Sequence, residues 1–135
     1  MRRRRALRAA RCCERGMLAR MISDTDFIAA ADATLDAIGR ALDEALAGSD
    51  ADVDWSINDG ILEIEGDDGG KLIVNRHVAN REMWLAARAG GFHYRAQGGA
   101  WRDTRSGEEL GVTLARLVKA QMGLDLSLPG LRAPE

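Results

Sequence analysis

Carboxylate side chains dominate one part of this chain. Residues 21–68 contain fourteen acidic residues and one basic residue, Arg40, so this segment carries a net charge of −13. The candidates for cation binding are Asp36, Asp43, Glu44, Asp50, Asp52 and Asp54. Carboxylate oxygens suit hard or borderline cations, but an open array without histidine or cysteine lacks the geometry that selects one metal tightly. If the helix end and the strand start are neighbours, we expect weak, adaptable cation binding. The alternative is a solvated, solubilising face.

The rest of the chain has the opposite charge. Residues 1–20 contain eight arginines and one glutamate, and residues 69–135 contain ten basic and six acidic residues. An acidic field attracts basic protein surfaces and repels the phosphates of nucleic acid. We therefore expect a basic protein partner and no nucleic acid. The first twenty residues could be a targeting segment, a nucleic-acid-binding arm or sequence upstream of a second start at Met21, and the helix-start signal after Met21 favours the last.

Enzyme signatures are missing from the sequence. It contains no G-x-S-x-G, no phosphate loop and no H-E-x-x-H, and GDDGG at residues 66–70 is more typical of a turn than of a nucleotide site. The adjacent Cys12 and Cys13 form neither a spaced zinc motif nor a disulfide framework. No run of eighteen apolar residues would span a membrane. The sequence thus predicts a protein that is not an enzyme and has no membrane partner.

The stretch WLAARAGGFHY, residues 84–94, predicts two antiparallel strands joined by a tight turn. Alternation puts Leu85 and Ala87 on one face and Trp84 on the other, so we expect Trp84 to lie away from the core. His93 would then lie on a sheet face, where a solvated or satisfied histidine is more typical than a ligand. An exposed tryptophan can anchor a partner, or it can simply cover the sheet.

A long first helix must position the acidic residues. Ser23 and Asp26 resemble a capping box, Ile22 and Phe27 fit a hydrophobic staple, and Gly48 marks the end of the helix. Apolar residues recur at three- and four-residue steps and predict one buried stripe. The stripe consists of Phe27, Ala31, Thr34, Leu35, Ile38, Leu42 and Ala45, and the wet side carries Asp32, Asp36, Asp43 and Glu44.

From Asp50 the period changes to two, which indicates strands. We expect a first hairpin around residues 58–60, a third strand at KLIVN, and further strands at residues 83–88, 91–96 and 100–103. Ser106 and Glu109 resemble a second capping box that opens a helix. The predicted fold is α+β: a two-layer sandwich with N- and C-terminal helices on one face of a five- to six-stranded antiparallel sheet.

Several motifs occur in the order found in one family. The acidic first helix, DVDWSINDGILEIE, KLIVNR, WLAARAGGFHY and WRDTRSGEEL together resemble a bacterial frataxin of the CyaY type. The resemblance implies weak binding of Fe²⁺ and Fe³⁺ by an acidic ridge. It also implies a role in iron–sulfur cluster assembly, as iron donor or iron-dependent regulator of the complex of cysteine desulfurase and scaffold protein. A bacterial cytoplasmic protein is expected, monomeric without iron, with iron-driven oligomers left open.

The resemblance also assigns residues and boundaries. It places Asp43, Glu44, Asp50, Asp52 and Asp54 on the ridge, and Trp84, Asn75 and Arg76 in partner binding. Gly39 and Arg40 stand where the family often has further acidic residues, so the iron capacity is expected to be reduced. The expected organisation is an Arg-rich extension at residues 1–20, a frataxin-like domain at 21–128 and a tail at 129–135 that lies over the helices before it frays. An acidic protein-interaction module with incidental metal binding is the alternative function.

Overall fold

The first helix begins and ends where the sequence predicts. In the computed structural model, which describes residues 23–128 and 130–134, α2 spans Asp24–Ala47. Ser23 caps it by accepting a hydrogen bond from the Asp26 amide (3.1 Å), and Gly48 follows its last turn. The predicted buried stripe is confirmed from Phe27 to Leu42, because these side chains face the sheet. The staple through Ile22 and the interpretations of residues 1–20 lie outside the described residues.

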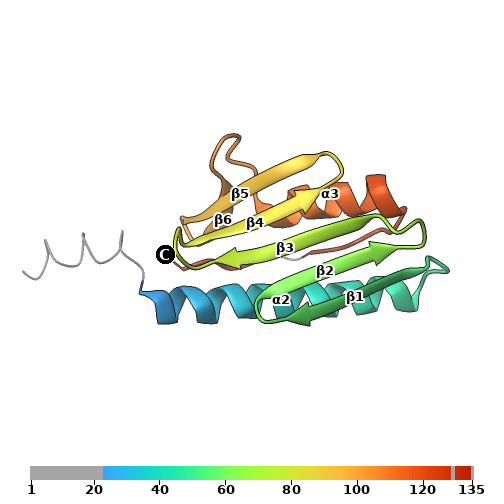
Figure 1. Cartoon of the computed structure of the whole chain (residues 1–135), viewed down its shortest axis with the longest axis horizontal. Helices are drawn as coiled ribbons and strands as arrows, with labels where there is room; N and C mark the ends of the chain where they lie inside the picture. Colours follow the sequence, from blue (N-terminus) through green and yellow to red (C-terminus); the bar gives the residue numbers. More distant parts are fainter. Residues whose placement is uncertain (1–22, 129, 135) are drawn as a thin grey trace, which may run out of the picture.

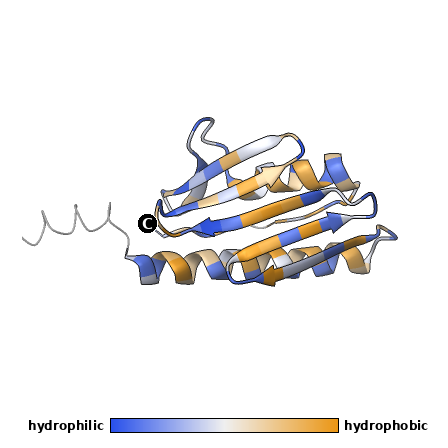
Figure 2. Ribbon diagram, in the orientation of Figure 1, coloured by the Kyte–Doolittle hydropathy of each residue, from blue (hydrophilic) through white to orange (hydrophobic). Residues whose placement is uncertain are grey.

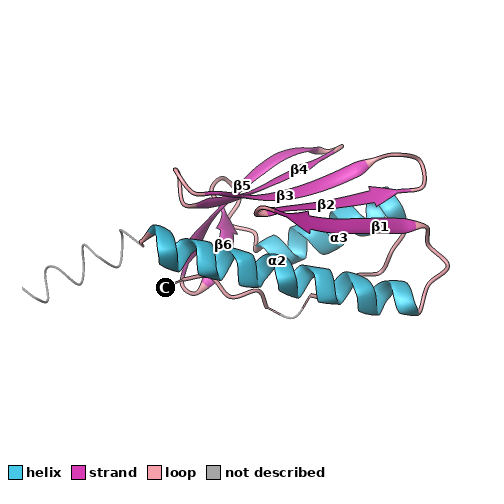
Figure 3. Cartoon of the chain, turned by 60° about the horizontal axis from the view of Figure 1, so that its bottom comes forward, coloured by secondary structure: helices cyan, strands magenta, loops and turns pink. Residues whose placement is uncertain are grey.

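Six strands follow and form one antiparallel meander, in agreement with the predicted five or six. The strands are β1 (Val53–Asn58), β2 (Ile61–Gly66), β3 (Lys71–His77), β4 (Glu82–Ala87), β5 (Gly90–Gln97) and β6 (Ala100–Asp103). They pair in chain order, each antiparallel to the next. Figures 1 and 3 show α2 and the second helix, α3 (Leu110–Met122), side by side on one face of this sheet, so the predicted α+β sandwich is confirmed.

The core lies between the sheet and the two helices. Figure 2 shows apolar and polar residues alternating along β2, where Leu62 and Ile64 are fully buried. Trp101 of β6 is fully buried and meets Phe27 edge to face, with ring centroids 5.8 Å apart. Its indole N–H donates to the Thr34 hydroxyl (2.9 Å), so the polar groups buried with these rings are satisfied.

The start of the second helix differs from the prediction. Glu109, not Ser106, is its N-cap, and its side chain accepts a hydrogen bond from the Val112 amide (3.1 Å). Ser106 instead accepts from the Glu108 amide (3.1 Å) within the preceding turn. Ser106 is the more usual capping type, but Gly107, at a φ of +77°, breaks the helical path after it, so the helix begins later and Glu109 takes the capping position.

The C-terminal segment is more firmly held than predicted. Leu124, Leu126 and Leu131 are buried against the helices, in agreement with the expected packing. However, residues 130–134 do not simply fray, because Arg132 bridges to Ala100 of β6 and the Ala133 amide donates to the Gly99 carbonyl (2.9 Å). The packed unit therefore extends past residue 128. None of the helices in the described part of the chain is long and apolar enough to cross a bilayer.

A glycine in α2 lets the edge strand approach the helix closely. Gly39 is buried, and a Cβ atom added there would lie 2.7 Å from the Trp55 ring of β1. Real Cβ atoms essentially never come that close to a neighbour, so the ring contacts the helix at this point only because residue 39 has no side chain. The family often has an acidic residue at the position of Gly39. In this chain that position is buried beneath Trp55 and is not part of the surface.

We expect Gly39→Ala to destabilise the protein by about 1–3 kcal/mol, because displacement of Trp55 outweighs the roughly 1 kcal/mol that alanine contributes in a helix. The free energy of unfolding from urea titration measures this. Gly48→Ala is the matched control, since a Cβ at Gly48 would meet nothing within 4 Å. A Gly39→Ala protein more stable than the parent would show that Trp55 moves without cost.

Candidate functional site

Five of the predicted carboxylates lie near the junction of α2 and β1, and the sixth, Asp36, lies near the middle of α2. We call the six residues Asp36, Asp43, Glu44, Asp50, Asp52 and Asp54 the acidic surface, and all six are exposed. The junction is held by Trp55, whose indole N–H donates to Asp43 Oδ1 (2.9 Å). The loop of residues 48–52 is shaped by Ser49, whose hydroxyl accepts from the Ala51 amide (3.0 Å). The helix end and the strand start are therefore neighbours. The sequence analysis made weak cation binding depend on this arrangement.

The acidic surface is open rather than closed around a point. Within residues 23–128 and 130–134, no three His, Cys, Asp or Glu side chains come together in a group that could hold a metal ion. No ion pair between described residues involves any of the six carboxylates. Asp54 also lies directly opposite Glu65 of β2, and like charges in this position repel. The surface therefore combines unneutralised charge with a lack of fixed ligand geometry.

Trp84 lies on the face of the sheet away from the helices, as the alternation predicts. It is only half-buried, whereas its neighbours Met83 and Leu85 are in the core. The structure adds a feature that the sequence did not indicate, because His77 of β3 and His93 of β5 stack on the two faces of the indole. The ring centroids are 3.9 and 4.5 Å apart, and both pairs are within 8° of parallel. We call these three side chains the ring ladder.

A buried carboxylate, Glu82, holds the ring ladder in place through contacts with Trp84 and His93. Glu82 belongs to the outer face, yet its side chain is only 4% exposed. Its two oxygens accept from the Trp84 indole N–H (2.9 Å) and from Arg95 Nε (2.6 Å), and His93 Nδ1 lies 3.6 Å away. Burial by itself would raise the pKa of Glu82, but the hydrogen bonds from Trp84 and Arg95 and the nearby charges lower it below its ordinary value.

Asn75 and Arg76 lie on different sides of β3. Asn75 is directly opposite Trp84 in the strand register and shares its face. Arg76 points to the other face, where it pairs with Asp32 of α2 and approaches Asp59 (3.7 Å), and its side chain is 19% exposed. Successive residues of a strand point to opposite faces, so Arg76 does not share a surface with Trp84. Its guanidinium ties the sheet to the helix.

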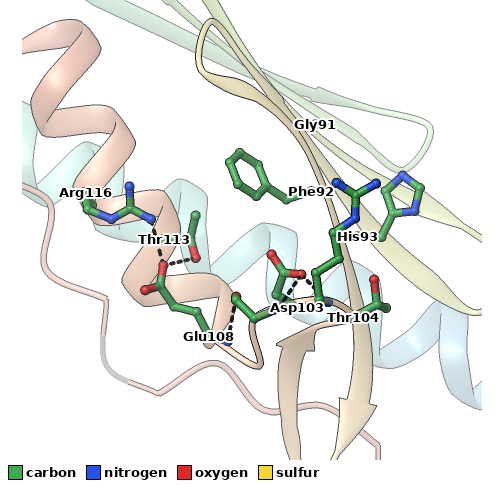
Figure 4. A pocket seen from close by; sticks show the side chains of 10 residues that line it. Gly91, Phe92, His93, Asp103, Thr104, Glu108, Thr113 and Arg116 are labelled. Atoms are coloured by element: carbon green, nitrogen blue, oxygen red, sulfur yellow. Dashed lines mark hydrogen bonds and ion pairs between the residues drawn. The ribbon is translucent and has the colours of Figure 1, made fainter.

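A hollow of about 320 Å³ lies between β5, the turn after β6 and α3 (Figure 4). Across it, Glu108 Oε1 accepts from the Thr113 hydroxyl (2.5 Å) and from Arg116 (2.9 Å), and these hydrogen bonds lower the pKa of Glu108. Asp103 accepts from backbone amides of the turn. These charged groups hold the turn against the helix. None of the residues predicted for cation or partner binding lines this hollow.

Known proteins share this arrangement over most of the chain. A model of the frataxin-like domain matches residues 20–124. An iron-sulfur cluster assembly protein CyaY from Ralstonia nicotianae is 45% identical over 107 residues, which cover 79% of this chain and 95% of that protein. The CyaY protein of Burkholderia mallei is 44% identical over 106 residues, which cover 78% of this chain and 97% of that protein.

Solved structures agree with the fold. Frataxin from Psychromonas ingrahamii, described within the CyaY protein family, superposes with a TM-score of 0.68 at 31% identity, over 80% of this chain and 99% of that one. Trimeric yeast frataxin, solved in a ferrous complex, superposes with a TM-score of 0.62 at 24% identity, over 70% of this chain and 86% of that one, and supports the fold alone. The chain belongs to the frataxin-like family.

Proposed function

We propose that this protein binds iron weakly on the acidic surface and modulates iron–sulfur cluster assembly, as an iron donor or an iron-dependent regulator of the complex of cysteine desulfurase and scaffold protein. Family membership over the whole domain, among relatives named as assembly proteins, supports the pathway. The observation that supports the iron part is the hydrogen bond between Trp55 and Asp43, which brings the exposed carboxylates at the end of α2 close to those of the following loop and the start of β1.

Iron is cargo in this proposal and not a resident cofactor. Oxygen ligands bind ferrous and ferric ions without selecting their geometry, and an open array leaves several positions of the ion to water. Such an ion is held by the field of many carboxylates and can leave quickly. Other divalent and trivalent cations are therefore expected to compete with it. Arg40, exposed next to the surface, further weakens the field.

Docking follows from the same charge. The segment from residue 21 to residue 68 carries −13, which attracts a basic surface of the desulfurase. The scaffold protein would contact the other candidate surface, on the outer face of the sheet around Trp84 and Asn75. In this proposal the protein is a monomer without iron, works in the bacterial cytoplasm and catalyses no reaction itself.

A second function is favoured by one observation. Because no group of three potential metal ligands comes together among the described residues, the acidic surface could serve docking alone, with metal binding incidental to it. The two functions differ in one respect. A regulator that depends on iron changes its effect on cluster assembly when iron binds, whereas a docking module acts equally in metal-free buffer.

The first prediction concerns the position of the iron site. Titration of the protein with ferrous iron should perturb backbone amide signals in the last turns of α2, in residues 48–52 and in β1. Neutralising Asp50, Asp52 and Asp54 to asparagine should weaken this response several-fold, because electrostatic attraction holds the ion. Asp24→Asn with Asp26→Asn, at the other end of α2, is the control and should leave it unchanged. Perturbation centred on His77 or His93 would reject the site.

The second prediction concerns docking on the desulfurase. Affinity should fall steeply as salt rises toward 0.15 M, where the Debye length is about 8 Å. Reversing Asp50 and Asp52 to lysine should reduce affinity at least tenfold, an effect of about 1.4 kcal/mol. Both side chains lie in the exposed loop after α2, so the fold should tolerate the change. The same reversals at Asp24 and Asp26 alter the net charge equally, and an equal loss there would contradict a localised docking surface.

The third prediction concerns Trp84. Trp84→Ala should weaken scaffold binding by about 2 kcal/mol or more, the scale of an interface hot spot, and leave the iron titration unchanged. It should also cost about 1–2 kcal/mol of stability, because Glu82 loses a hydrogen-bond donor and the imidazoles lose their stacking partner. Trp84→Phe, which keeps an aromatic ring between them, is the control. Unchanged scaffold affinity in a folded Trp84→Ala protein would make the tryptophan a mere cover of the sheet.

A further inference from the structure

The histidines of this chain are concentrated at one place. The sequence contains two, and both stack on Trp84. They come from β3 and β5, the strands on either side of β4, as Figure 1 shows. Histidine is the side chain whose charge ordinarily changes near pH 6.5. Both imidazoles of the chain therefore lie on the two faces of one half-exposed indole.

The two imidazoles have different surroundings. His93 Nδ1 lies 3.6 Å from Glu82 Oε1, so a proton on His93 completes an ion pair with a buried carboxylate. His77 Nδ1 accepts a hydrogen bond from the Asn80 amide (3.3 Å), and a proton on that nitrogen would remove the acceptor. Protonated His93 also places a cation on the indole face, which attracts it. A proton on His93 thus has a carboxylate partner, whereas a proton on His77 Nδ1 would displace a hydrogen bond.

Other charged groups around the ring ladder are partly balanced. Arg95 offsets Glu82, and the pocket beside His93 carries Asp103 and Arg105 of opposite sign. Beside the turn that His77 holds, Arg81 pairs with Asp24 (2.6 Å). Positive charge is in excess at the edge of the sheet formed by β5 and β6. Arg95 is directly opposite Arg102 of β6, both are exposed, and like charges across two strands repel each other.

This edge of the sheet therefore presents two exposed guanidinium groups, of which Arg95 is paired with Glu82. A carboxylate placed above Arg95 and Arg102 would relieve their repulsion, and protonated imidazoles would add to the attraction. The acidic surface has the opposite preference, because it attracts cationic groups. The molecule thus presents two surfaces that select partners of opposite charge.

We propose that His77, Trp84 and His93 act as one proton-dependent docking element that receives a protein surface bearing carboxylate side chains. Binding there strengthens as the imidazoles gain protons, with His93 contributing most because Glu82 faces it. The inference rests on the proposed function, in which the partner at this face is the scaffold protein. Beyond the proposed function, the inference specifies that the partner surface is negatively charged and that the contact depends on pH.

The test is scaffold affinity as a function of pH. The full chain should bind about threefold or more tightly near pH 6 than near pH 7.5, the effect of one or two partly solvated ion pairs. A variant with His77→Gln and His93→Gln, which keeps polar side chains at both positions, should lose most of that difference. Because the scaffold titrates identically in both experiments, the comparison isolates this chain's histidines. Arg102→Gln should weaken binding at both pH values and preserve the pH dependence.

A readout on the free protein separates the inference from the proposed function. The indole N–H signal of Trp84, identified by its loss in Trp84→Phe, should follow a histidine titration and stop doing so in the double variant. Scaffold binding with the same pH dependence in both proteins would overturn the inference and leave the proposed function standing. No scaffold binding at any pH would overturn both. An indole signal that does not respond to pH would refute the coupling within the ring ladder.

Discussion

Burial of one sheet face against two helices is the constraint from which both candidate surfaces follow. Because each strand alternates, covering Leu62, Leu72 and Leu85 commits every second residue to the opposite face. Neither described helix covers that face, so Trp84 and both histidines remain at least partly accessible among residues 23–128 and 130–134. The same packing draws β1 against α2, where Trp55 lies on Gly39 and reaches Asp43, and so brings the acidic end of the helix next to the acidic start of the strand.

Much of this arrangement could be predicted from the sequence because it depends on local patterns. The ends of α2, the six strands and the outward direction of Trp84 follow from capping residues and alternation, which need only neighbours along the chain. The contacts that could not be predicted join residues far apart in sequence. His77 and His93 meet Trp84 only because the meander sets β3, β4 and β5 side by side in one particular register.

The wrong helix cap and the features that the sequence did not indicate have the same origin. Ser106 has the spacing of a helix cap, but the conformation of the turn after β6 gives that role to Glu109. Arg76 stands next to Asn75 in sequence and on the opposite side of the sheet in space, where Asp32 neutralises it. Glu82 gave no signal, because nothing in its local sequence indicates that Trp84 and Arg95 would bury a carboxylate on the outer face. The family resemblance suggested that Gly39 replaces an acidic residue of the ridge. In the structure, the Trp55 ring occupies the space that a side chain at residue 39 would need.

The charge distribution links these features to function. In the proposed function, the acidic surface, which has no group of three potential metal ligands among the described residues, and the exposed arginines of the sheet would contact different partners. The most direct measurement is the rate of cluster formation by the desulfurase and scaffold, with and without this protein, across iron concentrations. The account predicts that the protein changes this rate in an iron-dependent manner and that neutralising Asp50, Asp52 and Asp54 removes the iron dependence. An effect of equal size at every iron concentration, or one that survives these substitutions, would contradict it.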